Sequence, residues 1–224
     1  MPIYLNREYI LTMLLDSNKP APLIVCLHGG TGNADSFKYA LGISNIFNGK
    51  AIIAYLNATL NSSGNSAWNS GGGFNSGVDD VGYIESFVSM IKNAKKVTDV
   101  YLVGHSNGAM MGYRMLIEKP HLFKGLFSMS GDVMVDNNGL FTGKIKHMHG
   151  SLDENVPLEG GTGINGFIYP PVENAVYSFT NAESIEFENG LLISAGHPLS
   201  EIKAAIISEK GTTLPDLIHD FVMG

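Results

Sequence analysis

The short run of residues 23–27 constrains the fold most, because every one of its side chains is apolar. The proline-rich turn signal at residues 18–22 precedes it and separates it from an earlier strand-like run at residues 9–15. A strand that is apolar at every position is buried on both faces, and such strands belong to parallel sheets covered by helices. Similar runs recur at residues 51–56, 100–103, 125–129, 145–149 and 191–194.

Helical patterns occupy several gaps between these runs. Residues 79–95 carry apolar side chains at helical spacing, with Asp79 or Asp80 placed to cap the first turn. A second helix is predicted over residues 107–118 and ends before a proline. Residues 57–77 are rich in Asn, Ser and Gly and predict a long loop. Strands that alternate with helices predict an α/β fold whose mostly parallel central sheet of about eight strands is flanked by helices.

Length and composition bound the classes of function. A chain of 224 residues suits a single domain, residues 1–224, that buries its own core. The formal net charge of −7 argues against nucleic acid as a partner, since phosphate binding relies on clustered Lys and Arg. No apolar run has bilayer-spanning length and no signal-peptide pattern is visible, so we expect a cytoplasmic protein without membrane insertion. Cys26, the sole cysteine, is expected to pack as a buried apolar side chain.

A serine stands where a strand-like run meets a helix-like run. In the sequence Gly-His-Ser-Asn-Gly of residues 104–108, Ser106 lies at the corner between them. Glycines on both sides permit a tight turn that exposes the hydroxyl, which is the arrangement of a nucleophilic hydrolase. Ser106 is therefore the candidate nucleophile.

Candidates for an acid and a base follow other strands, at the sheet edge where open α/β folds bind their ligands. Asp153 follows the strand-like run at residues 145–149, and His197 follows the run at residues 191–194. The order Ser, Asp, His along the chain is the one expected of the α/β-hydrolase fold. In this scheme His197 removes the proton from Ser106, and Asp153 orients the imidazole and stabilises its charged form.

Two other residues compete for these roles. Asp132 follows the apolar run at residues 125–129 and is the alternative acid. His219 is the alternative base, although its segment has the helical pattern of an element that docks on the sheet. We prefer Asp153 and His197.

Backbone N–H groups are needed to stabilise the negative oxygen of a tetrahedral intermediate. The glycine-rich turn after the central strand can point such groups inward, and we expect Gly30 to donate one, with Thr31 as the second choice. Asn107, at the positive end of a helix dipole, is expected to supply the other. His28 is expected to support this turn through its ring.

Other histidines and the single tryptophan have structural as well as functional interpretations. His147 and His149 lie two residues apart and share one face of a strand, so they are able to ligate a metal. No third ligand is evident at a suitable spacing, and packing in a buried strand is the favoured interpretation. Trp68 is a candidate substrate-binding residue, and packing of its own loop is the alternative.

Several blocks resemble a known family in order along most of the chain. They are His28-Gly-Gly-Thr-Gly-Asn, Trp68, Val78-Asp-Asp-Val-Gly-Tyr-Ile, Gly104-His-Ser-Asn-Gly-Ala-Met-Met, His149-Gly-Ser-Leu-Asp, Val156-Pro and Gly160-Gly. These blocks are similar to those of the polyhydroxybutyrate depolymerase and feruloyl esterase-like α/β hydrolases. The resemblance implies an esterase in which Ser106, Asp153 and His197 have the catalytic roles given above.

We therefore expect a serine carboxylesterase that works through an acyl-enzyme, with no metal or organic cofactor. Because the sheet and its helices use most of 224 residues, no large lid domain is expected and the cleft should be open. An open cleft favours small-molecule or oligomeric esters with short acyl, hydroxyalkanoate or feruloyl-type groups. The alternatives are a peptidase, thioesterase or dienelactone hydrolase on the same fold, or a non-catalytic binding protein. A second copy of the chain, in a homodimer, is the one protein partner compatible with this expectation.

Overall fold

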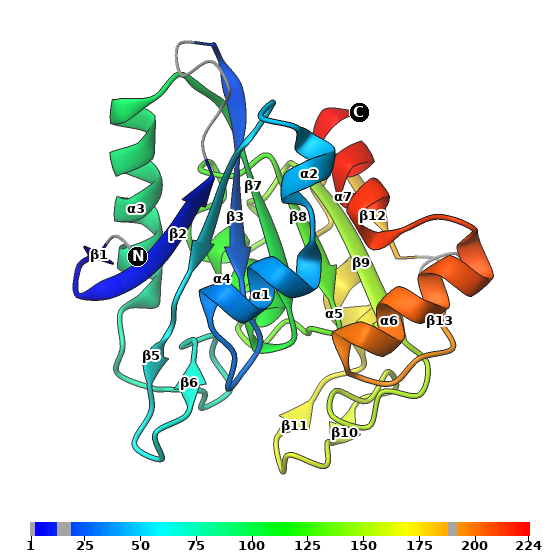
Figure 1. The fold of residues 1–224 in the computed structure, drawn as a ribbon. Helices are drawn as coiled ribbons and strands as arrows, with labels where there is room; N and C mark the ends of the chain where they lie inside the picture. Colours follow the sequence, from blue (N-terminus) through cyan, green and yellow to red (C-terminus); the bar gives the residue numbers. More distant parts are fainter. Residues whose placement is uncertain (1–2, 13–18, 188–191) are drawn as a thin grey trace.

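The computed structural model describes residues 3–12, 19–187 and 192–224. A sheet of nine strands forms the centre of this described part of the chain (Figure 1). Its strands are β1 Ile3–Tyr4, β2 Arg7–Thr12, β3 Ala21–Leu27, β4 Ile52–Leu56, β7 Val97–His105, β8 Gly125–Met129, β9 Lys144–Gly150, β12 Ser184–Glu186 and β13 Leu192–Ile193. The spatial order is β1-β2-β4-β3-β7-β8-β9-β12, and β13 also pairs with β9. β2 is antiparallel to β1 and β4, whereas the other pairs of this sheet are parallel. The predicted mostly parallel sheet is confirmed.

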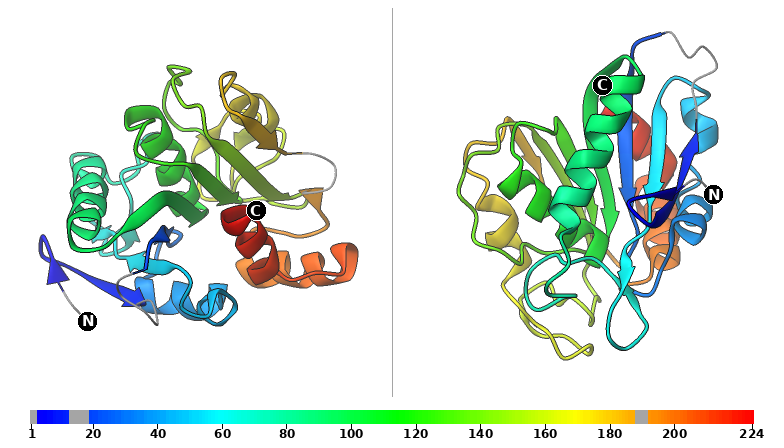
Figure 2. Two further views of the ribbon diagram at one scale, coloured as in Figure 1. Left: turned by 90° about the horizontal axis from the view of Figure 1, so that it is seen from above. Right: turned by 90° about the vertical axis from the view of Figure 1, so that its left-hand side faces the viewer.

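Helices cover both faces of the sheet (Figure 2). One face carries α3 Asp80–Ala94, α4 Asn107–Glu118 and α5 Val172–Tyr177; the other carries α1 Ala34–Leu41, α2 Ser44–Phe47, α6 Leu199–Ala205 and α7 Leu214–Met223. A π-helical turn, Ile206–Lys210, continues α6. Within the described ranges, no helix combines the length and the apolar character that crossing a bilayer requires.

The central strand β3 explains why its sequence is apolar throughout. Leu23, Val25 and Leu27 pack in the core on the side of α3 and α4, whereas Ile24 and Cys26 pack on the side of α1 and α7. All five side chains are fully buried. Burial of each large aliphatic side chain stabilises the fold by about 1.5–3 kcal/mol, so a polar residue at any of these positions would weaken one layer. Burial also raises the pKa of the Cys26 thiol, consistent with a packing role.

Predicted and observed bounds agree where periodicity or capping is strong. β8 and α4 have the predicted bounds. α3 begins after Asp79, whose side chain accepts a hydrogen bond from the N–H of Gly82. The early strand extends to Thr12, and residues 13–15 of that prediction lie outside the described residues, as does Leu191 of the last predicted strand.

The prediction of a plain loop over residues 57–77 is wrong in one respect, because this segment contains the hairpin of β5 Thr59–Leu60 and β6 Ser66–Ala67. A second hairpin consists of β10 Gly161–Thr162 and β11 Ile168–Tyr169. Both hairpins project from the edge at which β3, β7 and β9 end (Figure 1). The strand ends and the two hairpins together surround the candidate site.

Candidate active site

Ser106 occupies a strained corner between β7 and α4. Its backbone has φ 53° and ψ −126°, a conformation that costs a non-glycine residue about 1–3 kcal/mol. The surrounding backbone holds this conformation: the N–H of Ser106 donates to the carbonyl oxygen of Met129 at 2.8 Å, and its own carbonyl accepts from Ala109 and Met110. The candidate nucleophile is therefore fixed by the sheet on one side and by the first turn of its helix on the other.

His197 bridges the other two predicted catalytic residues. Its Nε2 lies 2.8 Å from Ser106 Oγ, and its Nδ1 lies 2.8 Å from Asp153 Oδ2. Because a carboxylate oxygen can only accept, Nδ1 donates its proton to Asp153. Nε2 is then the acceptor for the hydroxyl proton of Ser106. Strand ends that are distant in the sequence thus bring the three predicted residues together.

The loop after β9 fixes the Asp153 carboxylate. Asp153 Oδ1 accepts hydrogen bonds from the N–H groups of Asn155 and Val156, each at 2.9 Å. Burial by itself would raise the pKa of Asp153, but the hydrogen bonds from His197 and from the Val156 N–H outweigh it and lower the pKa. Asp153 is therefore held as a carboxylate with one oxygen directed to the histidine.

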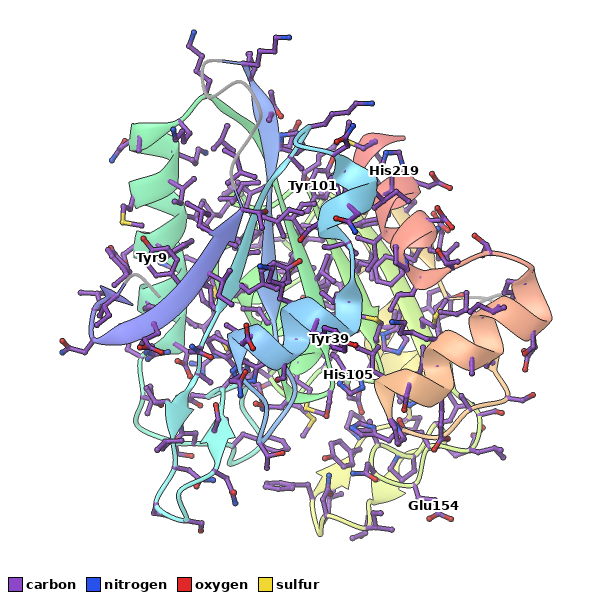
Figure 3. The ribbon with its side chains drawn as sticks, in the orientation of Figure 1. Tyr9, Tyr39, Tyr101, His105, Glu154 and His219 are labelled. Atoms are coloured by element: carbon purple, nitrogen blue, oxygen red, sulfur yellow. The ribbon has the colours of Figure 1, made fainter. Side chains whose placement is uncertain are left out.

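The two rival residues lie away from this hydrogen-bonded series. Asp132 is fully buried, and its Oδ1 accepts from the N–H of Val133, while its Oδ2 has no partner in the described chain. His219 lies on α7 beside Phe47 and Asp220. Figure 3 places His219 toward the end of the sheet opposite His105, the neighbour of the nucleophile. The structure joins Ser106 to neither rival.

The predicted oxyanion turn forms part of the cleft wall through Gly29, Gly30 and Thr31, and the prediction needs a correction at Thr31. The N–H of Thr31 donates to the carbonyl oxygen of Ser66 at 2.7 Å, so it is already used. The N–H groups of Gly30 and Asn107 donate to no acceptor within the described residues, and both residues line the cleft. These two groups are available to an incoming oxygen.

The ring of His28 holds the oxyanion turn, as expected. Its Nδ1 donates to the carbonyl oxygen of Gly29 at 2.7 Å, and its Nε2 accepts from the N–H of Ala58 at 3.1 Å. Burial lowers the pKa of His28, which favours the neutral ring that this pattern requires. The turn is thereby connected to the segment that follows β4.

The substrate-binding prediction for Trp68 is wrong, because the residue is fully buried and does not line the cleft. Its indole N–H donates to the carbonyl oxygen of His28 at 2.9 Å. The side chain of Asn107 holds the same loop: Oδ1 accepts from the N–H of Trp68, and Nδ2 donates to Ser70 Oγ. The sequence does not predict that the Asn107 side chain binds this loop, because nothing in the sequence shows which loop faces the elbow.

His105 has a specific structural role beside the nucleophile. Its Nε2 donates to the carbonyl oxygen of His197 at 3.0 Å, which fixes the backbone of the candidate base. Burial, followed by the proximity of the His197 ring, lowers the pKa of His105 to about 4. The ring therefore remains neutral near neutral pH and keeps its hydrogen bond to the His197 carbonyl oxygen.

A cleft of about 570 Å³ opens over Ser106. Among the described residues, its lining contains no Lys, Arg, Asp or Glu, but it contains six asparagines: Asn61, Asn65, Asn75, Asn107, Asn155 and Asn165. Phe74 and Phe167 also line it and stack face to face with ring centroids 3.9 Å apart. A second hollow, of about 790 Å³, runs along α3, and Ser106, Asp153 and His197 do not line it. The cleft at Ser106 suits an uncharged ligand with hydrogen-bonding groups.

The metal interpretation of His147 and His149 finds no support in their contacts. The two rings hydrogen bond to each other in the core, with His147 Nε2 and His149 Nδ1 3.0 Å apart. Within the described part of the chain, no group of three or more His, Cys, Asp or Glu side chains is arranged to hold a metal ion.

A family model described as the alpha/beta hydrolase fold matches residues 22–147, more than half of the chain. The chain belongs to the alpha/beta hydrolase fold family. The matched region of this α/β hydrolase runs from β3 through the elbow at Ser106 into β9. The strand-to-helix turn at Ser106 has the form of the elbow found in this family.

Solved esterase structures share the fold of this α/β hydrolase at low sequence identity. A carboxylesterase of Bacillus cereus superposes with a TM-score of 0.61 and 17% identity, covering 93% of this chain and 96% of that one. Esterase PE8 superposes with a TM-score of 0.61 and 18% identity, covering 97% of this chain and 98% of that one. Est1E from Butyrivibrio proteoclasticus superposes with a TM-score of 0.62 and 14% identity, covering 96% of this chain and 94% of that one. A search among curated proteins finds no significant match.

Proposed function

We propose that this α/β hydrolase is a serine carboxylesterase that acts through an acyl-enzyme. The observation that carries the proposal is the series Ser106, His197 and Asp153, with 2.8 Å at both hydrogen bonds. Side chains in this arrangement activate a serine for attack on a carbonyl carbon. The esterases among the structural neighbours support the same class of reaction.

The first half of the reaction transfers the acyl group to the enzyme. Ser106 Oγ bonds to the ester carbonyl carbon while His197 Nε2 takes the hydroxyl proton, and the carbonyl electron pair moves onto oxygen. The N–H groups of Gly30 and Asn107 stabilise that oxyanion, each lowering the barrier by about 3–4 kcal/mol. The intermediate then collapses, the bond to the alcohol oxygen breaks, and His197 returns its proton to the departing alcohol.

Water completes the cycle by the same steps. His197 Nε2 removes a proton from water as its oxygen bonds to the acyl carbon. Collapse of the second intermediate breaks the bond to Ser106 Oγ, which regains the proton, and the free acid leaves. Asp153 remains ionised throughout and stabilises the imidazolium each time it forms.

The chemistry of the cleft supports neutral esters with short acyl, hydroxyalkanoate or aromatic groups. The asparagine amides donate to and accept from hydroxyl and carbonyl groups, while Phe74 and Phe167 offer an aromatic surface. These groups agree with the resemblance to polyhydroxybutyrate depolymerase and feruloyl esterase-like proteins. Est1E, a structural neighbour, is known in a complex with ferulic acid.

A nitrophenyl, hydroxybutyrate and feruloyl ester panel tests the proposal together with a fluorophosphonate probe. The wild-type protein is expected to hydrolyse at least one ester and to be labelled, whereas Ser106→Ala loses activity by about 10³-fold or more and is not labelled. Ser89→Ala, which removes an exposed hydroxyl on α3, is the matched control and should retain both properties. Absence of labelling in folded wild-type protein, or retained activity in Ser106→Ala, would contradict the proposal.

A further inference from the structure

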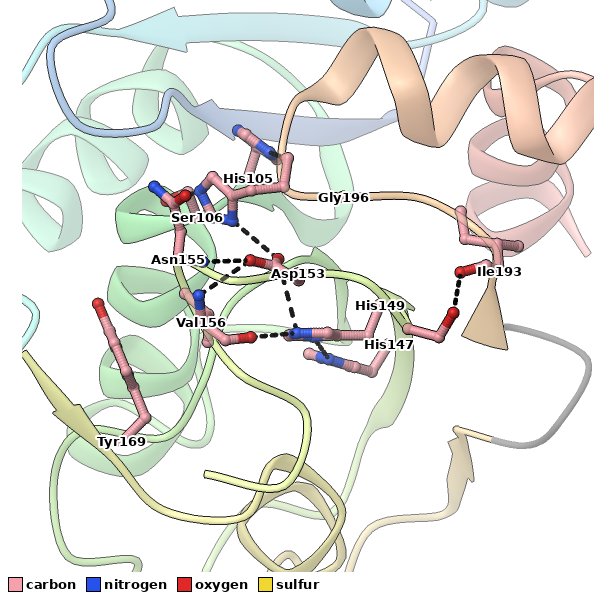
Figure 4. Close-up of polar contacts among 12 residues, drawn as sticks. His105, Ser106, His147, His149, Asp153, Asn155, Val156, Tyr169, Ile193 and Gly196 are labelled. Carbon is pink, nitrogen blue, oxygen red and sulfur yellow. Dashed lines mark hydrogen bonds and ion pairs between the residues drawn. The ribbon is translucent and has the colours of Figure 1, made fainter. Parts of the chain in front are cut away.

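A series of hydrogen-bonded polar side chains crosses the core beside the candidate triad, and its His147 and His149 are seen in Figure 4. Tyr113 Oη lies 2.7 Å and Ser128 Oγ 3.0 Å from His147 Nδ1. His147 Nε2 lies 3.0 Å from His149 Nδ1, and His149 Nε2 lies 2.8 Å from the carbonyl oxygen of Val156. All four side chains are fully buried. The series connects the nucleophile's helix α4, through β8 and β9, to the loop that carries the acid.

The last acceptor fixes the proton positions along the whole series. A carbonyl oxygen can only accept, so His149 carries its proton on Nε2 and donates it to Val156. His149 Nδ1 is then an acceptor, and His147 must donate from Nε2. His147 Nδ1 in turn accepts from a hydroxyl, that of Tyr113 being the nearest. Both rings are neutral, in agreement with burial, which lowers the pKa of each.

This series ends on the groups that hold the acid. Val156, whose carbonyl oxygen accepts from His149, donates its own N–H to Asp153 Oδ1. The same Nε2–H of His149 lies 3.6 Å from Asp153 Oδ2, the oxygen that accepts from His197. His149 therefore fixes the loop through its hydrogen bond to the Val156 carbonyl oxygen. It also places the positive end of its N–H dipole beside Asp153 Oδ2.

Packing alone does not account for these polar residues. An unpartnered polar group in the core costs about 1–3 kcal/mol, and apolar side chains of similar size would fill the space without that risk. A fully satisfied buried network does have one distinct property, since its bonds permit only one arrangement of its members. The arrangement here is the one that directs Asp153 to the base.

We propose that His149, oriented by His147 and Tyr113, is a positioning residue for Asp153. This inference rests on the proposed esterase function and assigns no contact with substrate to His149. Removal of His149 lets the loop 153–156 relax, so the carboxylate loses its alignment with His197. A misplacement of about 1 Å at a catalytic group lowers the rate by about 10²-fold, so the effect is expected in kcat and not in KM.

Two substitutions at His149 separate positioning from packing. His149→Gln places an amide N–H near the position of Nε2 and can still donate to Val156, whereas His149→Leu removes the donor at similar volume. We expect kcat on a nitrophenyl acetate ester to fall about tenfold or more in His149→Leu, with KM changed less than about twofold, and to recover at least partly in His149→Gln. An unchanged kcat in folded His149→Leu, or equal losses in both variants, would overturn the inference.

Fluorophosphonate labelling distinguishes the failure of this inference from the failure of the proposed function. Wild-type protein that is not labelled contradicts the esterase itself, whereas His149→Leu that is labelled at the wild-type rate contradicts only the positioning role. Nitrogen NMR of the wild-type protein provides a measurement that needs no variant to fold. It should show neutral Nε2–H tautomers for both His147 and His149, and an Nδ1–H tautomer at His149 would overturn the inference.

Discussion

At the scale of single residues, the elbow depends on a close approach that only glycine allows. A Cβ built on Gly108 would lie 2.1 Å from the carbonyl oxygen of Leu27, a backbone atom of the central strand. We predict that Gly108→Ala lowers the free energy of unfolding by about 1–3 kcal/mol, because the strand and helix must separate. Gly30→Ala is the control, because no described atom beyond the two chain neighbours lies within 4 Å of its added Cβ, and its change should stay below about 1 kcal/mol. Denaturant unfolding measures both, and equal stabilities would contradict the close approach.

The buried carboxyl group of Asp132 makes the stability of the fold depend on pH. Burial raises its pKa from 3.8 to about 7, so the folded state binds a proton that the unfolded chain releases near pH 4. Stability from this group is therefore complete below about pH 4 and is lost as the pH rises through 7. Asp132→Asn stays neutral, so its free energy of unfolding at pH 8 should exceed that of the wild type by on the order of 3 kcal/mol. At pH 4 the two proteins should have nearly equal free energies of unfolding. Equilibrium unfolding at both pH values measures this, with exposed Asp136→Asn as the control.

At the scale of elements, long periodic segments were predictable and short paired ones were not. α4 has the predicted bounds because a strained corner starts it and a proline follows it. The hairpins β5–β6 and β10–β11 consist of strands of two residues each, too short to show alternation. Their pairing depends on tertiary contacts, which explains why the sequence indicated only a loop over residues 57–77 and no element over residues 161–169.

The stack of Phe74 on Phe167 joins the loop after β6 to the β10–β11 hairpin. Its rings are 3.9 Å apart at 19°, and such a pair contributes about 0.5–1.5 kcal/mol beyond the area it buries. We predict that Phe167→Ala speeds amide hydrogen exchange throughout residues 161–169. Ile168→Ala, which removes a side chain that is 74% exposed in the same hairpin, should leave exchange unchanged. Equal exchange in the two variants would mean that the stack does not hold the hairpin.

At the scale of the whole molecule, the positions of the three candidate catalytic residues were predictable from the sequence, whereas the contacts around them were not. Parallel strands end at one edge, so Ser106, Asp153 and His197 were expected to meet from their order and strand ends. The contacts of His149 and Asn107 were not predictable in the same way. They depend on which loops face each other across the sheet, and neither periodicity nor spacing contains that information.

Arg7 and Asp80 connect the first strands of the chain to the site across the whole fold. Asp80 is fully buried, forms an ion pair with Arg7, and accepts from the N–H of Asn69, the neighbour of Trp68 in the loop held by Asn107. Arg7 also lies 4.1 Å above the ring of Tyr83. Strand β2 and the wall behind the candidate nucleophile are thus held by one buried carboxylate.

We predict that Arg7→Met lowers the free energy of unfolding by about 3–5 kcal/mol, because it leaves the Asp80 charge buried without its partner. The double variant Arg7→Met/Asp80→Asn should regain much of this loss, since the amide oxygen can still accept from Asn69 and no charge remains. Lys124→Met is the matched control: its ion pair with Glu183 is exposed, and its loss should cost less than about 1 kcal/mol. Urea unfolding of the four proteins decides the matter, because a double variant no more stable than Arg7→Met would show that the guanidinium acts by packing on Tyr83 and not by neutralising Asp80.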